Sequence, residues 1–224
     1  MCCDAGWDGE MYVSTVEMNL REQSARVWFG VACLFISACQ NQDPGEQGLF
    51  DVVERYPDAA PIAPATECVV MTGREPVVSA AHVEVCSEID YPRFPPAGGP
   101  HFSVWADFDT YEEPIETGFL VHSLEHGAVA LLYDCPEGCP EVVDVFAGIK
   151  ATREDTLCRA QSSDNRIIIA PEPKLDVAIA AVAWGHVYLA TCLDEGSLSA
   201  FVEAHYAQAP EDLCAAGRST PVCP

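Results

Sequence analysis

The chain has 224 residues, 49% of them hydrophobic and 21% charged, so it can bury one sizeable core and is not a disordered chain. Its 35 acidic and 11 basic residues give a formal net charge of -24, which repels the phosphates of nucleic acids and of anionic lipids. Twelve cysteines favour an oxidising compartment, because cytosolic chains of this size rarely carry so many. We therefore predict an exported, acidic, globular protein without a nucleic-acid partner.

The first feature along the chain is an apolar run of ten residues, 27–36, with Arg21 and Arg26 before it and small residues after it. The order basic, apolar, small is typical of a secretory signal, and ten residues are too few to span a bilayer as a helix. The alternative interpretation is a buried helix of a cytosolic domain. We favour the signal, because the small residues stand where processing requires them.

The apolar run ends in Ser37-Ala38-Cys39, which resembles a bacterial lipobox. This resemblance implies that Cys39 is lipidated, and that a lipid anchor holds the protein to a membrane of the bacterial cell envelope. We predict a signal segment over residues 1–38, with Met18 as its true start. Residues 39–66, rich in Pro and Ala, then form the anchor and an extended linker, and residues 67–224 form a single globular domain.

The first half of this domain contains two short apolar runs, 68–72 and 81–86, which we expect to pair as a β-hairpin. A Pro- and Gly-rich segment, 91–100, follows them and predicts a rigid, irregular loop. Residues 127–133 (GAVALLY) predict a buried strand, and Gly127 at its start is typical of the end of a preceding helix.

The second half contains two predicted helices with strands between them. Pro140 is typical of a first helical position, and a last helix begins at Asp194 or Ser197. Between the helices, residues 166–170 predict a strand, and the apolar run 177–193 predicts a strand with a bulge at Gly185. This order predicts an α+β fold with a mostly antiparallel sheet and helices packed on one face.

Eight cysteines lie in the predicted domain, and their even number predicts that all are paired. Sequence order suggests, without excluding other pairings, that each cysteine bonds to its neighbour. The four suggested pairs are Cys68 with Cys86, Cys135 with Cys139, Cys158 with Cys192, and Cys214 with Cys223.

Three histidines are candidates for a shared metal site. His101 follows the Pro-Gly loop, and His122 and His126 lie in the segment VHSLEHG, one turn apart if the segment is helical. The segment HSLEH also matches the H-x-x-E-H pattern of inverzincin metallopeptidases, in which two histidines hold zinc and the glutamate is a base. That pattern should lie in the middle of a helix, whereas Gly127 follows it at once.

Several of these motifs recur together in one known family. The loop PPAGGPH (95–101), the segment VHSLEHGAVALLY (121–133) and the helix FVEAHYAQAPE (201–211) occur in an order that resembles the bacterial family called domain of unknown function 3105. The resemblance covers residues 80–212. It implies an exported or membrane-anchored protein, and it adds His82, at a position where the family tends to carry histidine.

We therefore expect a lipid-anchored envelope protein in which His101, His122 and His126 bind a transition metal, Zn or Cu, with His82 or Glu125 as a further ligand or as a partner of the ligands. A disulfide-stabilised binding or scaffold domain without a metal is the main alternative, and a metallopeptidase is the third. A non-enzymatic role is favoured, and no pattern in the sequence identifies a protein partner.

Overall fold

The computed structural model describes residues 50–56, 59–77, 79–135, 138–161 and 163–224. The predicted signal segment, Cys39 and the first part of the predicted linker lie outside these residues. The described part contains a six-stranded sheet in the order β1-β2-β8-β7-β5-β6, and a two-stranded sheet of β3 and β4. The strands are β1 (Phe50–Arg55), β2 (Val69–Arg74), β3 (His82–Val83), β4 (His101–Phe102), β5 (Val129–Tyr133), β6 (Ile167–Pro171), β7 (Ile179–Ala183) and β8 (His186–Ala190).

Four helices accompany the strands, and all neighbours in the large sheet are antiparallel except β5 and β6. The helices are α1 (Thr117–Glu125), α2 (Pro140–Thr152), α3 (Thr156–Arg159) and α4 (Glu195–His205). The parallel pair β5 and β6 is joined through α2, as a parallel connection requires. The predicted α+β class, with one mostly antiparallel sheet in a single domain, is confirmed.

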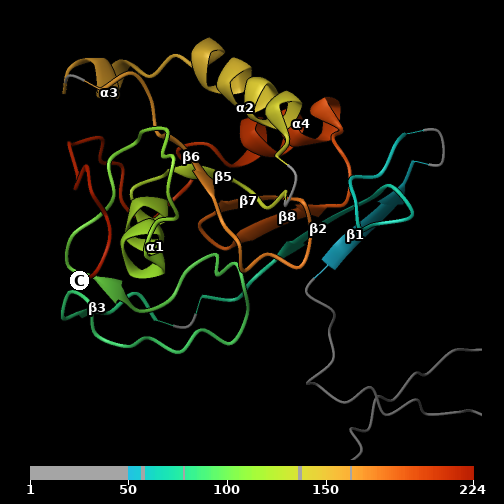
Figure 1. The fold of residues 1–224 in the computed structure, drawn as a ribbon. Coiled ribbons are helices and arrows are strands. Elements are labelled where there is room, and N and C mark those ends of the chain that lie inside the picture. Colours follow the sequence, from blue (N-terminus) through green and yellow to red (C-terminus); the bar gives the residue numbers. More distant parts are fainter. Residues whose placement is uncertain (1–49, 57–58, 78, 136–137, 162) are drawn as a thin grey trace, which may run out of the picture. The chain divides into compact units, whose positions relative to one another are not determined.

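Both faces of the large sheet are buried at β5, β6 and β7, whereas β1 is exposed at residues 51–55. On one face Val129 and Leu131 of β5 join a core that includes side chains of α2 and α4. On the other face the alternate residues, Ala130 and Leu132, join a core that includes α1. Figure 1 shows α2 and α4 on one side of the sheet and α1 on the other. The prediction that the helices pack on one face of the sheet therefore holds for α2 and α4, whereas α1 packs on the other face.

Local signals place the helix ends correctly. Pro140 is the first residue of α2, and the Asp194 side chain accepts a hydrogen bond from the Ser197 backbone at 3.0 Å, which caps α4. Gly127 follows α1 with a φ of +88°, a conformation that glycine adopts without strain. Within the described ranges, no helix is long and apolar enough to cross a membrane.

Strand pairing differs from the sequence-based expectations at three places. The predicted hairpin is wrong, because β2 pairs with β1 and β8, while β3 pairs with β4. The run 177–193 forms a hairpin of β7 and β8, with Gly185 (φ +73°) in its turn instead of in a bulge. Residues 50–55, expected to belong to a linker, form the edge strand β1.

All eight cysteines of the predicted domain are paired, as expected, but three of the suggested pairings are wrong. The disulfides join Cys68 with Cys192, Cys86 with Cys223, Cys135 with Cys139, and Cys158 with Cys214. Sequence neighbours are separated because the sheet brings together distant segments, such as β2 and the end of β8. Four disulfides are compatible with an exported domain in an oxidising compartment.

Candidate metal centre

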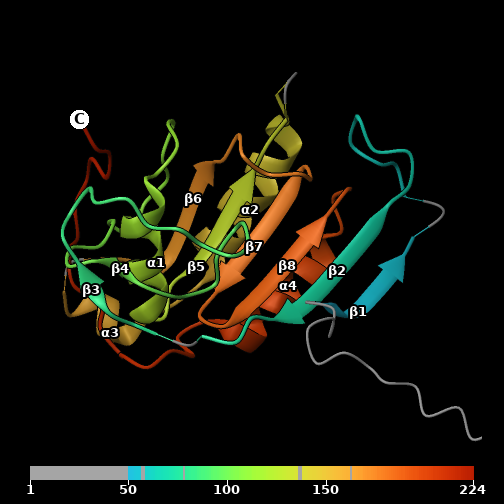
Figure 2. The same ribbon diagram turned by 90° about the horizontal axis from the view of Figure 1, so that it is seen from below.

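Three short elements converge beside the large sheet. β3 and β4 run parallel, with His82 opposite His101, and α1 packs against β4. Figure 2 shows β3, β4 and α1 next to one another at one end of the fold. His122 and Glu125 are three residues apart in α1, so their side chains leave the same face of the helix.

The four side chains of these elements form a compact group that we call the His₃Glu group: His82, His101, His122 and Glu125. One potential ligand atom from each lies within 4.8 Å of every other. Glu125 Oε2 lies 3.0 Å from His101 Nε2 and 3.7 Å from His82 Nε2. The three imidazole rings are 4.7–4.9 Å apart between centroids. Imidazole and carboxylate donors at these separations match the ligands of a transition-metal site.

Backbone carbonyls orient two of the rings. His101 Nδ1 donates to the Gly99 carbonyl at 2.8 Å, and His122 Nδ1 donates to the Phe102 carbonyl at 2.6 Å. A carbonyl can only accept, so each Nδ1 carries a proton, and in the neutral ring the lone pair is on Nε2. Metal-binding histidines are commonly oriented in this way through their second ring nitrogen.

The contact between His101 and Glu125 is short but is not a hydrogen bond. His101 is fully buried, and its Nε2 has no hydrogen-bond partner within the described residues. In the neutral form of His101 with its proton on Nδ1, Nε2 and the carboxylate oxygen face each other as two acceptors. This arrangement is unfavourable by itself, and a cation between the two atoms makes it favourable.

Burial keeps the central imidazole neutral. The pKa of His122 is lowered to about 4, mainly because the ring is desolvated and also because His126 lies nearby. A ligand imidazole must be neutral to bind a metal, so His122 is in its binding form at neutral pH. The folded protein therefore does not have to remove a proton from this ring.

His126 lies beside the His₃Glu group and is not one of its members. Its ring is 4.6 Å from that of His122 and 4.5 Å from Trp105, and its Nε2 lies 3.1 Å from Glu211 Oε2. Burial lowers its pKa to about 4. His126, which the sequence suggests as a ligand, therefore lies outside the His₃Glu group, whereas His82, which the family resemblance added, lies within it.

The inverzincin pattern fails its structural requirement. α1 ends at Glu125 and His126 is its C-terminal cap, so HSLEH does not lie in the middle of a helix. Glu125 joins His122 within the His₃Glu group, whereas His126 points to Glu211. In an inverzincin both histidines of the motif hold the zinc, whereas here only the first histidine, His122, belongs to the group.

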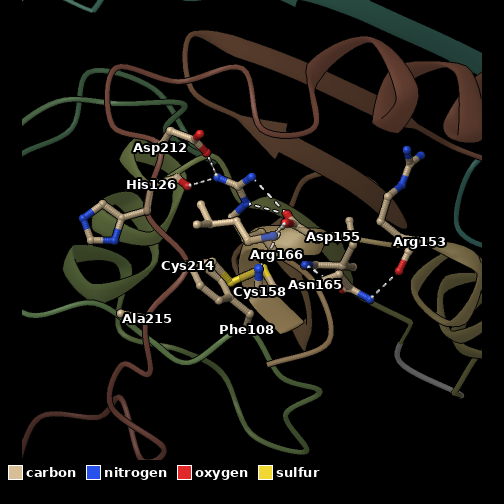
Figure 3. Close-up of a disulfide and its surroundings, with 12 residues drawn as sticks. Phe108, His126, Arg153, Asp155, Cys158, Asn165, Arg166, Asp212, Cys214 and Ala215 are labelled. Carbon is tan, nitrogen blue, oxygen red and sulfur yellow. Dashed lines mark hydrogen bonds and ion pairs between the residues drawn. A yellow bond between two sulfur atoms is a disulfide. The ribbon is translucent and has the colours of Figure 1, made fainter. Parts of the chain in front are cut away.

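A buried arginine holds the end of α1 in place (Figure 3). Arg166 donates to the His126 carbonyl at 3.1 Å and pairs with Asp155 and Asp212. Desolvation disfavours the charged guanidinium, but these carboxylates outweigh it and raise the pKa of Arg166. The ion pairs therefore fix the His126 carbonyl at the end of α1, next to Glu125, and no sequence pattern indicates these ion pairs.

The structure therefore defines a disulfide-bridged α+β domain with three histidines and one glutamate gathered at a single point. A protein-family model described as "Protein of unknown function (DUF3105)" matches residues 82–217, more than half of the chain, so the chain belongs to this family. The matched range begins at His82 and contains the whole His₃Glu group. No curated protein and no solved structure matches the chain.

Proposed function

We propose that the domain binds one divalent transition-metal ion through His82, His101, His122 and Glu125. The observation that supports this most strongly is the convergence of four ligand atoms within 4.8 Å, two of them on rings oriented by backbone carbonyls. A buried carboxylate facing an unprotonated imidazole nitrogen is stabilised when a cation lies between them.

The donor atoms suit Zn(II) or Cu(II). Nitrogen and carboxylate oxygen are borderline or hard ligands, and the eight cysteines of the domain are bonded to one another, so they offer no thiolate. Four protein ligands complete a tetrahedral zinc ion and leave no position for a substrate. The geometry therefore supports metal binding or metal transfer more than peptide hydrolysis.

Metal binding is tested with the purified full-length chain. After chelation and removal of the chelator, dialysis against Zn(II) or Cu(II) and elemental analysis should give one ion per chain. His122→Ala and Glu125→Gln should lose the ion, whereas His205→Ala, a histidine change outside the group, should retain it. Equal metal content in wild type and His122→Ala would contradict the proposal.

A scaffold domain without a metal is the second candidate. Disulfides between Cys68 and Cys192 and between Cys86 and Cys223 join distant segments, and two cores fill both sheet faces. Such a domain can hold its fold without an ion. The same dialysis experiment decides between the candidates, since a wild type that retains no metal supports the scaffold.

We further propose that the domain is exported and held at a bacterial membrane by a lipid on Cys39. The apolar run followed by Ser37-Ala38-Cys39 supports this location, and the four disulfides are compatible with it. A fatty-acid probe should label the wild type in cells. Equal labelling of Cys39→Ala would exclude this residue as the lipid site.

A further inference from the structure

We propose that the disulfide between Cys86 and Cys223 controls release of the metal, and that its reduction by an external thiol loosens the ligand His82. This inference rests on the proposed metal site and adds its regulation. It concerns residues 79–91, which we call the His82 arm.

His82 is the most accessible ligand of the group. Its side chain is 49% exposed, whereas those of His101 and Glu125 are 0% and 7% exposed. The other ligands lie on α1 or follow the Pro-Gly loop, which is buried at residues 95–99. A metal ion can therefore leave toward solvent most easily on the side of His82.

The non-covalent contacts of the His82 arm involve half-buried side chains, since Val83, Val85 and Ile89 pack against the core from the surface. β3 contains only two residues, and the His101 backbone donates to the Ala81 carbonyl at 3.1 Å. The Tyr91 hydroxyl donates to the Pro100 carbonyl at 2.8 Å, and Val83 is only partly buried. The Cys86 disulfide, four residues beyond His82, is the covalent attachment of the arm.

This disulfide is also the most accessible of the four. Cys86 is exposed and Cys223 is half-buried, whereas each of the other three disulfides has at least one buried cysteine. Cys86 also has a backbone φ of 67°, which residues other than glycine rarely adopt. The Ser87 backbone and hydroxyl, which donate to the Glu84 carbonyl at 3.1 and 2.7 Å, also close this turn, so the bridge and these hydrogen bonds hold it together.

The partner is a small dithiol or a protein with two reactive cysteines. Its thiolate attacks one sulfur of the bridge, a mixed disulfide forms, and its second thiol displaces it. Cys86 and Cys223 each gain a proton and an electron, and the partner leaves as a disulfide. The other end stays attached, because the Glu116 backbone donates to the Pro221 carbonyl at 2.9 Å, so the arm is the part that loosens.

Loosening the arm lowers the effective concentration of the His82 imidazole at the metal. Metal affinity typically falls about 10–100-fold when the groups that orient a ligand are lost. We therefore expect the metal to dissociate at least about tenfold faster after reduction, with His101, His122 and Glu125 still in place.

The experiment compares Cys86→Ser/Cys223→Ser with Cys135→Ser/Cys139→Ser, a matched loss of a bridge whose cysteines belong to the α2 side of the sheet. Each full-length protein is loaded with Zn(II), and dissociation is followed with a chromophoric chelator. The first variant should release Zn(II) at least about tenfold faster than wild type, and the control should release it at the wild-type rate. His82→Ala should release it faster as well, and removing the bridge from His82→Ala should add little.

Two further measurements keep the outcomes distinct. Hydrogen exchange of residues 79–91 in the metal-free protein should increase when the Cys86 bridge is removed. If this variant does not fold, mild phosphine reduction of the wild type, with alkylated cysteines identified by mass spectrometry, replaces it. Zn(II) binding with an unchanged release rate overturns the redox control alone, whereas a wild type that binds no Zn(II) overturns the proposed function and this inference together.

Discussion

At the scale of single residues, the contact between His101 and Glu125 determines what the site can do. In the neutral form of His101, whose Nδ1 donates to Gly99, Nε2 and the Glu125 carboxylate oxygen are two acceptors 3.0 Å apart in a buried position. Under the proposed metal binding, this contact weakens the metal-free protein and stabilises the protein that holds an ion. Stability and metal affinity should therefore respond in opposite directions when this pair is changed.

Glu125→Gln tests this opposition. The amide of glutamine can donate to His101 Nε2, so we expect the metal-free variant to be about 1 kcal/mol more stable, with a Tm roughly 2–4 °C higher. Its affinity for Zn(II) should fall by more than about tenfold, because a ligand is lost. Thermal unfolding and Zn(II) titration measure the two effects.

The control is Glu172→Gln, which changes another buried carboxylate outside the His₃Glu group. This variant should leave Zn(II) affinity unchanged. A metal-free Glu125→Gln protein that is clearly less stable than wild type would show that Glu125 has a partner that glutamine cannot replace.

At the scale of elements, the end of α1 positions two ligands at once. Gly127 has a φ of +88°, and a Cβ added there would lie 2.9 Å from the Cα of Ala207. Gly127→Ala should therefore destabilise the protein by about 1–3 kcal/mol and weaken Zn(II) binding by moving Glu125.

Gly148→Ala is the matched control, since nothing lies within 4 Å of its added Cβ on the exposed face of α2. It should stabilise the protein by about 0.5–1 kcal/mol, as alanine does in a helix, and equal effects of the two changes would contradict this account.

The packing of α4 on β8 should depend on pH. His205 stacks on His186 at 3.9 Å, and burial, His186 and Arg74 lower the pKa of His205 to about 4. In the unfolded chain its pKa is about 6.5, so the unfolded state takes up the proton first. The contribution of His205 to stability is therefore full above pH 6.5 and is lost as the pH falls toward 4.

His205→Phe keeps an aromatic ring in the stack and removes this titration. We expect the Tm of the metal-free wild type to fall between pH 7.5 and pH 5, and that of the variant to fall less. A part of the decrease should remain, because His122 and His126 titrate in the same direction. An identical decrease in both proteins would show that the stack does not carry the pH dependence.

At the scale of the whole molecule, disulfides connect segments that lie far apart in the sequence. Three of the four span 56, 124 and 137 residues, and each of these can contribute about 2–4 kcal/mol by restricting the unfolded chain. Mass spectrometry of a non-reduced digest should find Cys68 linked to Cys192 and Cys158 linked to Cys214. Peptides that link Cys68 to Cys86 would instead support pairing by sequence neighbours.

Local physical signals in the sequence predict much of this fold. Pro140, Asp194 and Gly127 mark helix ends because their backbone or capping chemistry acts within a few residues. Apolar runs predict the buried strands β5 and β6 for the same reason. These signals carry no information about which distant strand or cysteine is adjacent.

The site shows the same limit. His101 and His122 are visible as candidates from the Pro-Gly loop and the helical spacing, but residues between them do not indicate that β3 lies beside β4. His82 enters through a family resemblance alone, and His126 lies outside the group, with its Nε2 facing Glu211. The pairing of β3 with β4 brings His82 into the His₃Glu group, and this pairing depends on long-range contacts that no local sequence pattern encodes.

The central claim is tested most directly by locating the metal. A crystal of the Zn(II)-loaded protein should show one strong anomalous peak at the zinc absorption edge, bounded by His82, His101, His122 and Glu125, with ligand distances of about 2.0–2.2 Å. A zinc peak at another position, or none in the His₃Glu group at full Zn(II) loading, would contradict the account.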